Sequence, residues 1–415
     1  MPVYILSAQR TPLGRLGGNL SALAATDLGA IAIRAAVAKS GVQPEQIQAC
    51  YMGNVLQANQ GQNPARIAAI KAGLAPTTVS TSINKVCASG MKAVTLAASE
   101  LLIGQYDVVV AGGMESMSNT PYYLPQQRFG SKYGHVETKD GILTDGLTDA
   151  FSQDLMGHAA ELCASKYEIT RDAQDADALR SYDRALEAQK TGAFDSEIVP
   201  VPLPSRGGVP TVVATDEQPG KLLRDKFPTL KPAFLRPGQD PKTATVTAGN
   251  ASPLSDGAAA LVLVSERFYQ AHLTPQQRAD AVLLAGWADA EQAPEWFTTT
   301  PAKALPLAVA HAAKHVTALE EVDAADLGKA IDLFEINEAF AAVGCANRQI
   351  LGLDPAQVNV HGGAVALGHP LGCSGARILV TLIHALRRRQ QSLGAAAVCN
   401  GGGGASAVVL QIVKS

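Results

Sequence analysis

One short pattern occurs twice in this 415-residue chain and narrows the folds that it can adopt. Residues 87–90 read Cys-Ala-Ser-Gly and open an apolar stretch typical of a buried helix, and the next strand-like segment ends at residues 112–113. Residues 372–375 read Gly-Cys-Ser-Gly and open a second such stretch, whose following segment ends at residues 401–402. The repetition predicts two similar halves, and a chance match in a chain rich in alanine and glycine is the alternative. Small residues would let the two helices pack closely: Ala93, Ala97, Ala98, Gly375 and Ala376.

The segments on either side of these helices alternate between two hydrophobic patterns. Amphipathic stretches predict helices, and short apolar runs predict strands. The alternation indicates a layered α/β fold. The expected helices span residues 28–38 and 66–72, and the expected strands span residues 3–7, 49–55, 108–111, 258–264, 281–284, 330–334 and 395–399.

A long middle segment has a different composition, rich in tyrosine, proline and charged residues. Within it, Thr170 with Asp172 close behind predicts the start of an amphipathic helix that runs to about Lys190. The segment therefore looks like an insertion. The expected organisation is a first core half of residues 1–118 plus 249–268, an inserted loop domain of residues 119–248, and a second core half of residues 269–415.

The composition narrows the class of protein. A content of 47% hydrophobic and 17% charged residues is typical of a packed soluble chain. A net charge of −3 provides no basic field for nucleic acid or an anionic membrane. Six cysteines without a close-set framework favour reduced thiols over disulfides. The first residues lack the pattern of a signal peptide, so the expected location is the cytoplasm.

Two cysteines and one histidine stand in settings that suit covalent chemistry. Cys87 precedes a predicted helix, whose unpaired N–H groups are expected to lower the pKa of its thiol. Cys399 is followed by four glycines, whose backbone N–H groups can point at a ligand oxygen. His369 lies between Gly368 and Pro370, in a turn that restricts its ring. Two thiols and one fixed imidazole predict covalent acyl chemistry, although a free cysteine is most often a small core residue.

Two other kinds of site are considered and set aside. Residues 402–407 fit the G-x-G-x-x-A pattern of a dinucleotide site, but they lie too near the C-terminus to open the βαβ unit that such a site needs. His311 and His315 have the i, i+4 spacing of zinc ligands on a helix, but no third ligand is evident. A solvated helix face explains this pair better, so we expect no metal site.

Five longer motifs identify a family. They are residues 86–91 (Val-Cys-Ala-Ser-Gly-Met), 111–118 (Ala-Gly-Gly-Met-Glu-Ser-Met-Ser), 337–340 (Asn-Glu-Ala-Phe), 362–370 (Gly-Gly-Ala-Val-Ala-Leu-Gly-His-Pro) and 399–404 (Cys-Asn-Gly-Gly-Gly-Gly). In this order they resemble the thiolase family, most closely its short-chain biosynthetic members. The resemblance implies an α/β thiolase fold, with a duplicated five-layered α/β/α/β/α core and an inserted loop domain.

The resemblance also implies roles for five residues. Cys87 would be the nucleophile that carries the acetyl group, and His369 would take its proton and later help to hold the thioester oxygen. Cys399 would remove a proton from the α-carbon of a second acetyl-CoA. One oxyanion hole would form at His369 with a water held by Asn337, and the other from the backbone N–H groups of Cys87 and Gly401. No cofactor is implied.

The reaction that the resemblance implies joins two acetyl-CoA molecules into acetoacetyl-CoA and CoA, and the reverse thiolysis shares the same site. A degradative 3-ketoacyl-CoA thiolase of broader chain length is one alternative, and a non-catalytic acyl-binding protein is another. Family members form tetramers through the insertion, so a homotetramer is expected. The residues implied to contact the substrate or CoA are Leu147, Met156, Phe234, Ala248, Ser252, Ala339 and Phe340.

Some positions depart from the family's pattern. Leu155 stands where many members have a histidine, Pro219 aligns with a tyrosine of potassium-activated members, and Phe297 is followed by Thr298 instead of a proline. Potassium activation and branched substrates are therefore not expected. His361 is expected near the site, without a catalytic role.

Overall fold

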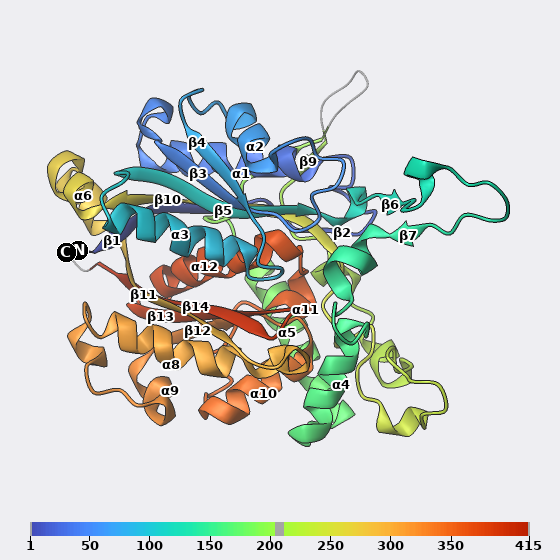
Figure 1. Ribbon diagram of the computed structural model, residues 1–415. Coiled ribbons are helices and arrows are strands. Elements are labelled where there is room, and N and C mark those ends of the chain that lie inside the picture. Colours follow the sequence, from blue (N-terminus) through green and yellow to red (C-terminus); the bar gives the residue numbers. More distant parts are fainter. Residues whose placement is uncertain (1, 204–210, 414–415) are drawn as a thin grey trace.

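Two halves of one sheet enclose a pair of helices (Figure 1). The computed structural model describes residues 2–203 and 211–413. The first half has the strand order β4 (Val79–Ile83), β3 (Ala49–Gly53), β5 (Val108–Ser116), β10 (Ser255–Ser265) and β1 (Val3–Arg10), with β2 (Gly14–Arg15) beside β10. The second half continues with β11 (Val282–Glu291), β14 (Gly404–Ile412), β13 (Leu393–Asn400) and β12 (Leu333–Ile336).

Helices form the other three layers (Figure 1). Helices α3 (Ser89–Leu102) and α12 (Leu371–Arg388) pack against each other between the two halves of the sheet. The outer face of the first half is covered by α1 (Ala25–Ser40) and α2 (Pro64–Ala72), and that of the second by α8 (Pro301–Ala312), α9 (Leu327–Ala330) and α10 (Ala341–Leu351). The predicted five-layered α/β/α/β/α core is confirmed. None of the helices in the described ranges has the length and apolar character needed to cross a membrane.

Strand β1 joins the two halves of the sheet. It runs antiparallel to β10 of the first half, with Val3 opposite Ser265. On its other side it runs antiparallel to β11, with Val3 opposite Leu284. A single strand thus pairs with one strand of each half, and the ten-stranded sheet is continuous.

Three apolar clusters fill the spaces between the layers. The central cluster is built from α3, α12 and the inner faces of both halves of the sheet, and includes Met91, Leu379 and Val398. A second cluster lies between the first half and α1 and α2. A third lies between the second half and α8. Burial of apolar surface on both faces of each half is the main force that holds the layers together.

Glycines let the central helices approach the first half of the sheet. A Cβ atom on Gly113 of β5 would lie 2.0 Å from the backbone oxygen of Gly372 at the start of α12. A Cβ on Gly375 would lie 2.5 Å from the backbone nitrogen of Met91 on α3. The close approach of the two helices that the small residues predict is confirmed.

The Gly113→Ala substitution tests this contact. We expect it to lower the free energy of unfolding by about 2–3 kcal/mol, because an added methyl group in a closed core forces the backbone to shift. Chemical denaturation followed by circular dichroism measures the change. Gly220→Ala is the control, since a Cβ atom there would meet no atom within 4 Å. Equal stability of the two variants would contradict the proposed contact.

Most of the predicted elements are present, but several boundaries are wrong: β3 ends at Gly53 instead of residue 55, and β11 continues to Glu291 instead of ending at residue 284. Thr170 caps α5 (Arg171–Lys190), as predicted, by accepting a hydrogen bond from the N–H of Ala173 at 3.2 Å. Strand β5 does not end at Gly113, because its pairing with β10 continues to Ser116. The predicted strand at residues 330–334 begins only at Leu333, since α9 ends at Ala330. A short apolar run cannot separate a buried strand from a buried helix.

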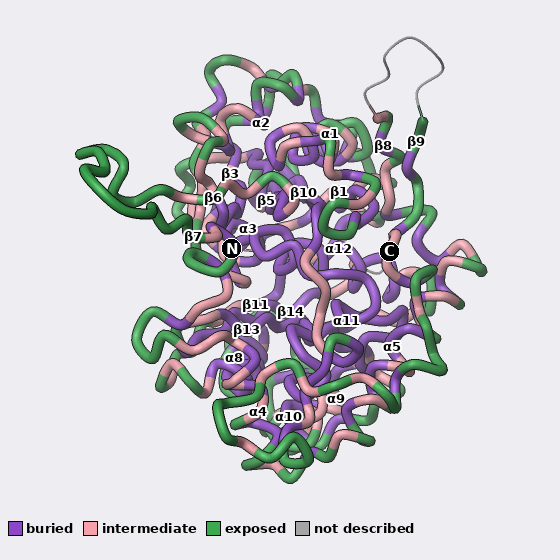
Figure 2. The backbone as a smooth tube through the Cα atoms, turned by 90° about the vertical axis from the view of Figure 1, so that its right-hand side faces the viewer, coloured by how far each residue is buried: buried purple, intermediate pink, exposed green. Residues whose placement is uncertain are grey.

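The predicted insertion contributes helices beside the second half and an exposed arm. Helix α5 packs against α10 and against α11 (Ala364–Leu367). Strands β6 (Tyr122–Tyr123) and β7 (Lys139–Asp140) pair at the base of an arm that projects from the core and is largely exposed (Figure 2). The other elements are α4 (Met156–Lys166) and the paired strands β8 (Val201–Pro202) and β9 (Val212–Val213). Residues 204–210 of the insertion lie outside the described residues.

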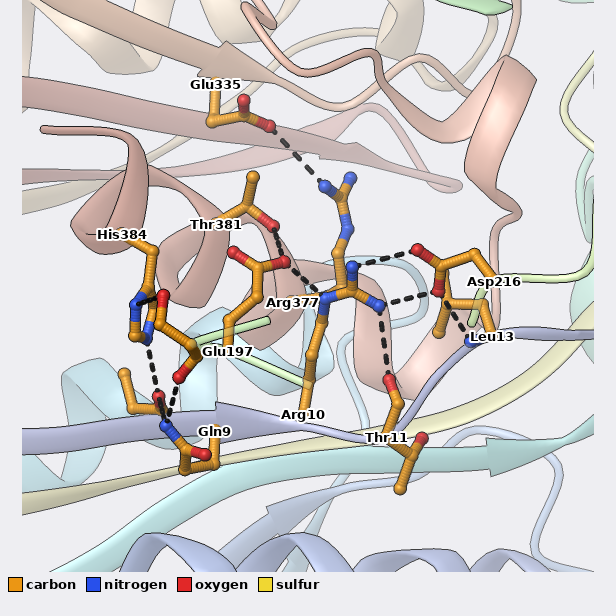
Figure 3. Close-up of polar contacts among 12 residues, drawn as sticks. Gln9, Arg10, Thr11, Leu13, Glu197, Asp216, Glu335, Arg377, Thr381 and His384 are labelled. Carbon is orange, nitrogen blue, oxygen red and sulfur yellow. Dashed lines mark hydrogen bonds and ion pairs between the residues drawn. The ribbon is translucent and has the colours of Figure 1, made fainter. Parts of the chain in front are cut away.

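A buried ion cluster ties the insertion to β1 (Figure 3). The Arg10 guanidinium donates to both carboxylate oxygens of Asp216, at 2.7 and 2.9 Å, and to Glu197 at 2.5 Å. The side chains of all three residues are 0% exposed. Thr381 of α12 also donates to Glu197, at 3.1 Å. The cluster therefore joins the first strand, two distant parts of the insertion and a central helix.

Candidate active site

One apolar cavity of about 280 Å³ collects residues from both halves and from the insertion. Cys87 comes from the first half, and His369 and Gly401 come from the second. Their convergence follows from the close packing of α3 and α12, because Cys87 lies just before the first of these helices and His369 just before the second. A thiol, an imidazole and a backbone N–H group thus line the same space.

A strained turn holds Cys87. Val86 has a φ of 46°, a left-handed conformation that β-branched residues rarely adopt. Ser89 secures the turn, because its hydroxyl donates to the Val86 carbonyl at 2.5 Å and accepts from the Lys85 N–H at 2.9 Å. Strain that neighbouring bonds maintain is typical of functional turns. It fixes the backbone immediately before the thiol.

The thiol of Cys87 is protonated before substrate binds. Burial raises its pKa to about 12, and hydrogen bonds from the backbone N–H groups of Gly401 and of Cys87 itself offset only part of this effect. The nearby Glu115 carboxylate raises the pKa further. The prediction that a helix N-terminus lowers this pKa is wrong, because enclosure dominates and α3 begins only at Ser89. A base must therefore remove the proton during the reaction.

His369 is held from two sides. Its backbone N–H donates to the Pro253 carbonyl at 3.1 Å, and its Nδ1 atom lies 2.6 Å from the Ser374 hydroxyl. Its Nε2 atom has no hydrogen-bond partner among the described residues. Burial, with a further contribution from Arg377, lowers its pKa to about 3. The ring is therefore neutral near pH 7 and can accept a proton.

Cys399 and Asn337 are buried and do not line the cavity. Cys399 is near the end of β13, is 0% exposed, and packs in an apolar cluster with Phe340 and Met156. Burial, followed by the nearby Cys87, raises its pKa well above the usual range, so the predicted tuning toward neutrality is wrong in the absence of substrate. The buried amide group of Asn337 has no hydrogen-bond partner within the described part of the chain. Such a group is suited to hold a water molecule.

Family models for the thiolase N-terminal domain and the thiolase C-terminal domain match residues 3–267 and 279–412. The chain belongs to the thiolase family. It is 51% identical to acetyl-CoA acetyltransferase 2 of Arabidopsis thaliana, over 99% of this chain and 97% of that protein. It is 49% identical to a cytosolic acetyl-CoA acetyltransferase of Gibberella zeae, over 94% and 93% of the two chains.

Solved thiolase structures have the same fold. The Acat5 thiolase of Ascaris suum, solved in complex with coenzyme A, superposes with a TM-score of 0.87 at 42% identity, over 99% of this chain and all (100%) of that one. The acetyl-CoA acetyltransferase of Bacillus anthracis superposes with a TM-score of 0.89 at 38% identity, over 99% and 98% of the chains. The similarity thus extends over both halves and the insertion.

This thiolase brings most of the predicted substrate-binding residues together. Ser252 stands on the cavity wall, where its hydroxyl donates to the Ala339 carbonyl at 2.8 Å. Ala248 does not line the cavity and is exposed. The residues that follow it in the chain line the cavity only from Ala251 onward. The predicted residues that line the cavity are Leu147, Met156, Phe234, Ser252, Ala339 and Phe340.

Further residues of the thiolase cavity are not among those predicted. They come from loops, from short helical turns and from the first residues of α4 and α12, and they carry no motif of their own. The two signals in the sequence are adjacency to predicted residues and departure from the family's pattern, as at Leu155 and Phe297. The additional lining residues are Met117, Leu143, Gly146, Leu155, Gly157, Ala251, Pro253, Leu254, Phe297 and Leu371.

His361 does not lie in the thiolase cavity, so its expected position near the site is wrong. It lines a separate depression with Arg184, Arg388 and Arg389. Its ring packs edge-on against Phe194, with the ring centres 5.9 Å apart. Although the residue is close to His369 in sequence, the turn at residues 362–368 carries the chain between two different surfaces.

Proposed function

We propose that this thiolase is an acetyl-CoA C-acetyltransferase, which condenses two acetyl-CoA molecules into acetoacetyl-CoA and CoA and catalyses the reverse thiolysis. The observation that carries the proposal is the convergence of Cys87, His369 and Gly401 on one cavity, with Cys399 buried beside it. The names of the relatives from Arabidopsis and Gibberella support the acetyl group as the unit transferred.

In the first half-reaction, Cys87 takes the acetyl group. The S–H bond breaks as His369 Nε2 accepts the proton, and the sulfur forms a bond to the thioester carbon. The bond between that carbon and the sulfur of CoA then breaks, and the CoA thiolate takes the proton from Nε2. The neutral ring of His369 supports the role of base, since an imidazolium could not accept this proton.

In the second half-reaction, Cys399 acts on a second acetyl-CoA. Its thiol first gives its proton to His369 Nε2, and the thiolate so formed removes a proton from the α-carbon. The resulting carbanion attacks the acetyl carbon on Cys87 and a carbon–carbon bond forms. The carbon–sulfur bond to Cys87 breaks, the Cys87 thiolate takes the proton from Nε2, and acetoacetyl-CoA leaves. The N–H groups of Cys87 and Gly401 would hold one developing oxyanion, and His369 with a water on Asn337 the other. Two thiols and one imidazole supply every proton transfer, so no cofactor is required.

Acetylation of Cys87 tests the route. We expect intact-protein mass spectrometry after exposure to acetyl-CoA to show one added acetyl group, which peptide mapping places on Cys87. Acetylation needs His369 to take the proton of Cys87, so His369→Asn should slow acetylation by about 10²- to 10⁴-fold. An acetyl group on another residue, or none in an enzyme that still performs thiolysis, would contradict the covalent route.

The preference for chain length separates this proposal from a degradative thiolase. The Ascaris relative was solved with coenzyme A, and the same ligand, with acetyl-CoA and acetoacetyl-CoA, is proposed here. The volume of about 280 Å³ of the cavity at Cys87 supports a short acyl group. Thiolysis of acetoacetyl-CoA should exceed thiolysis of longer 3-ketoacyl-CoA substrates in kcat/KM, and the reverse order would favour the degradative reaction.

We also propose a cytoplasmic homotetramer. The location is supported by the relative whose name includes the word cytosolic. The assembly is supported by the arm between β6 and β7, where Tyr122, Phe129 and Tyr133 are exposed by 66%, 91% and 103%. Large apolar side chains gathered on a projecting arm are typical of a contact between subunits. Light scattering measures the mass, and a monomer in solution would contradict the assembly.

A further inference from the structure

The Ser374 hydroxyl contacts His369 through the ring nitrogen that does not take part in the proposed chemistry. Ser374 lies in the first turn of α12 and is 1% exposed. Its Oγ atom is 2.6 Å from Nδ1 of His369 and 3.0 Å from the Pro370 carbonyl oxygen. Both distances are those of hydrogen bonds. One hydroxyl group therefore serves two neighbours.

The chemistry of these neighbours decides which way the protons point. A serine hydroxyl has one proton to donate and lone pairs to accept with, whereas a carbonyl oxygen can only accept. The Pro370 carbonyl also accepts from the N–H groups of Cys373 and Ser374, and a Ser374 proton directed to it at 3.0 Å avoids setting two oxygen lone pairs against each other. With its proton placed there, the Ser374 hydroxyl has only lone pairs left for His369. The bond to His369 can then be made only if Nδ1 carries a proton and donates it to Ser374.

We propose that Ser374 is a positioning residue that keeps the proton of neutral His369 on Nδ1 and leaves the lone pair of Nε2 free to take the proton of Cys87. The inference rests on the proposed function, in which His369 is the base. Ser374 has no role in the reaction described above.

The same bond serves both states of the ring. When Nε2 takes the Cys87 proton, the imidazolium donates from both nitrogens. The Nδ1–H bond to Ser374 is retained and becomes a bond from a charged donor, which is stronger. Nε2–H can then donate to the thioester oxygen before it returns its proton to CoA. No rotation of the ring is needed between the two roles.

This bond matters because other surroundings oppose the charged ring. His369 is enclosed, and the Arg377 guanidinium lies near enough to disfavour a second positive charge. Among the described residues, the Ser374 hydroxyl is the hydrogen-bond partner of the His369 ring. Removal of the Ser374 hydroxyl should therefore slow the step in which the ring becomes charged.

Nuclear magnetic resonance tests the position of the proton directly. With ¹⁵N-labelled histidine, two-bond ¹⁵N–¹H correlations distinguish a ring protonated on Nδ1 from one protonated on Nε2. The chain has eight histidines, and His369→Asn identifies the signal by its loss. We expect Nδ1 to carry the proton in the wild-type protein. A proton on Nε2 would overturn the proposal, and this readout does not depend on activity.

Kinetics test its consequence. Ser374→Ala should slow acetylation of Cys87 roughly 10- to 100-fold, as expected for loss of a hydrogen bond to a charged group, with KM little changed and one acetyl group still added. Ser374→Thr keeps the hydroxyl and should restore most of the rate. An unchanged rate in Ser374→Ala would overturn the proposal. Absence of acetylation in the wild-type protein would instead refute the proposed function and leave the magnetic resonance test valid.

Ser40→Ala is the matched control. Ser40 is also a buried serine of a helix, and its hydroxyl donates to the Val37 carbonyl at 2.7 Å while accepting from the Val42 N–H at 3.1 Å. It lies at the end of α1 in an outer layer, away from the cavity. Its loss should alter stability without altering the rate of acetylation. An equal slowing in both variants would show that Ser374 acts only through stability, which contradicts the proposal.

Discussion

Cys399→Ala is expected to abolish carbon–carbon bond formation while Cys87 still accepts an acetyl group. The base that removes the α-proton is lost, which should lower the rate of condensation by about 10²- to 10⁴-fold. The first half-reaction needs only Cys87 and His369, so one acetyl group should still be added. Formation of acetoacetyl-CoA measures condensation, and intact-protein mass spectrometry measures acetylation.

Cys50→Ala is the matched control for this variant. Cys50 is also 0% exposed, and burial also raises its pKa, to about 12. It lies in β3 and packs in the outer cluster beside α1 and α2. The same loss of a buried thiol there should leave both half-reactions unchanged. Condensation retained in Cys399→Ala, or loss of acetylation from a folded Cys399→Ala protein, would contradict the assigned role.

Arg10→Met is expected to lower the free energy of unfolding by about 3–5 kcal/mol. The substitution leaves the carboxylates of Glu197 and Asp216 buried without their cation, and an uncompensated buried charge is strongly destabilising. Chemical denaturation measures the loss. Because the cluster joins β1 to the insertion, the insertion should also become more sensitive to limited proteolysis.

Arg267→Met provides the comparison. Arg267 pairs with Asp107 at 2.7 Å, but its side chain is 70% exposed. Water compensates exposed charges, so loss of such a pair should cost no more than about 1 kcal/mol. If both variants lose the same stability, burial does not explain the strength of the Arg10 cluster.

The sequence predicts much of the fold because local patterns repeat. The two related motifs and the alternating apolar segments predict two similar α/β halves, and the resemblance to the thiolase family adds the five layers and the roles of Cys87 and His369. Motifs of this kind are informative because turns and helix starts depend mainly on residues that are close in sequence. The cap at Thr170 is predicted for the same reason.

What the sequence does not predict depends on enclosure by distant segments. The predicted direction of the shift in the Cys87 pKa is wrong because Cys87 packs against an apolar cluster that includes Ile142 and Leu371, far along the chain. The partners of Arg10 are equally remote in sequence, at residues 197 and 216. Charge and burial at such places are set by tertiary contacts, which periodicity and motif spacing do not contain.

The position of β1 between the two halves of the sheet also constrains the order of folding during biosynthesis. This strand leaves the ribosome well before its partners β10 and β11, which are made only after the whole insertion has been translated. Until then both of its edges are unsatisfied, and neither half can close its own layer. Pairings between such distant segments are slow to form. The first half therefore has all of its strands only once β10 has been made, and the other edge of β1 stays open to self-association until β11 emerges.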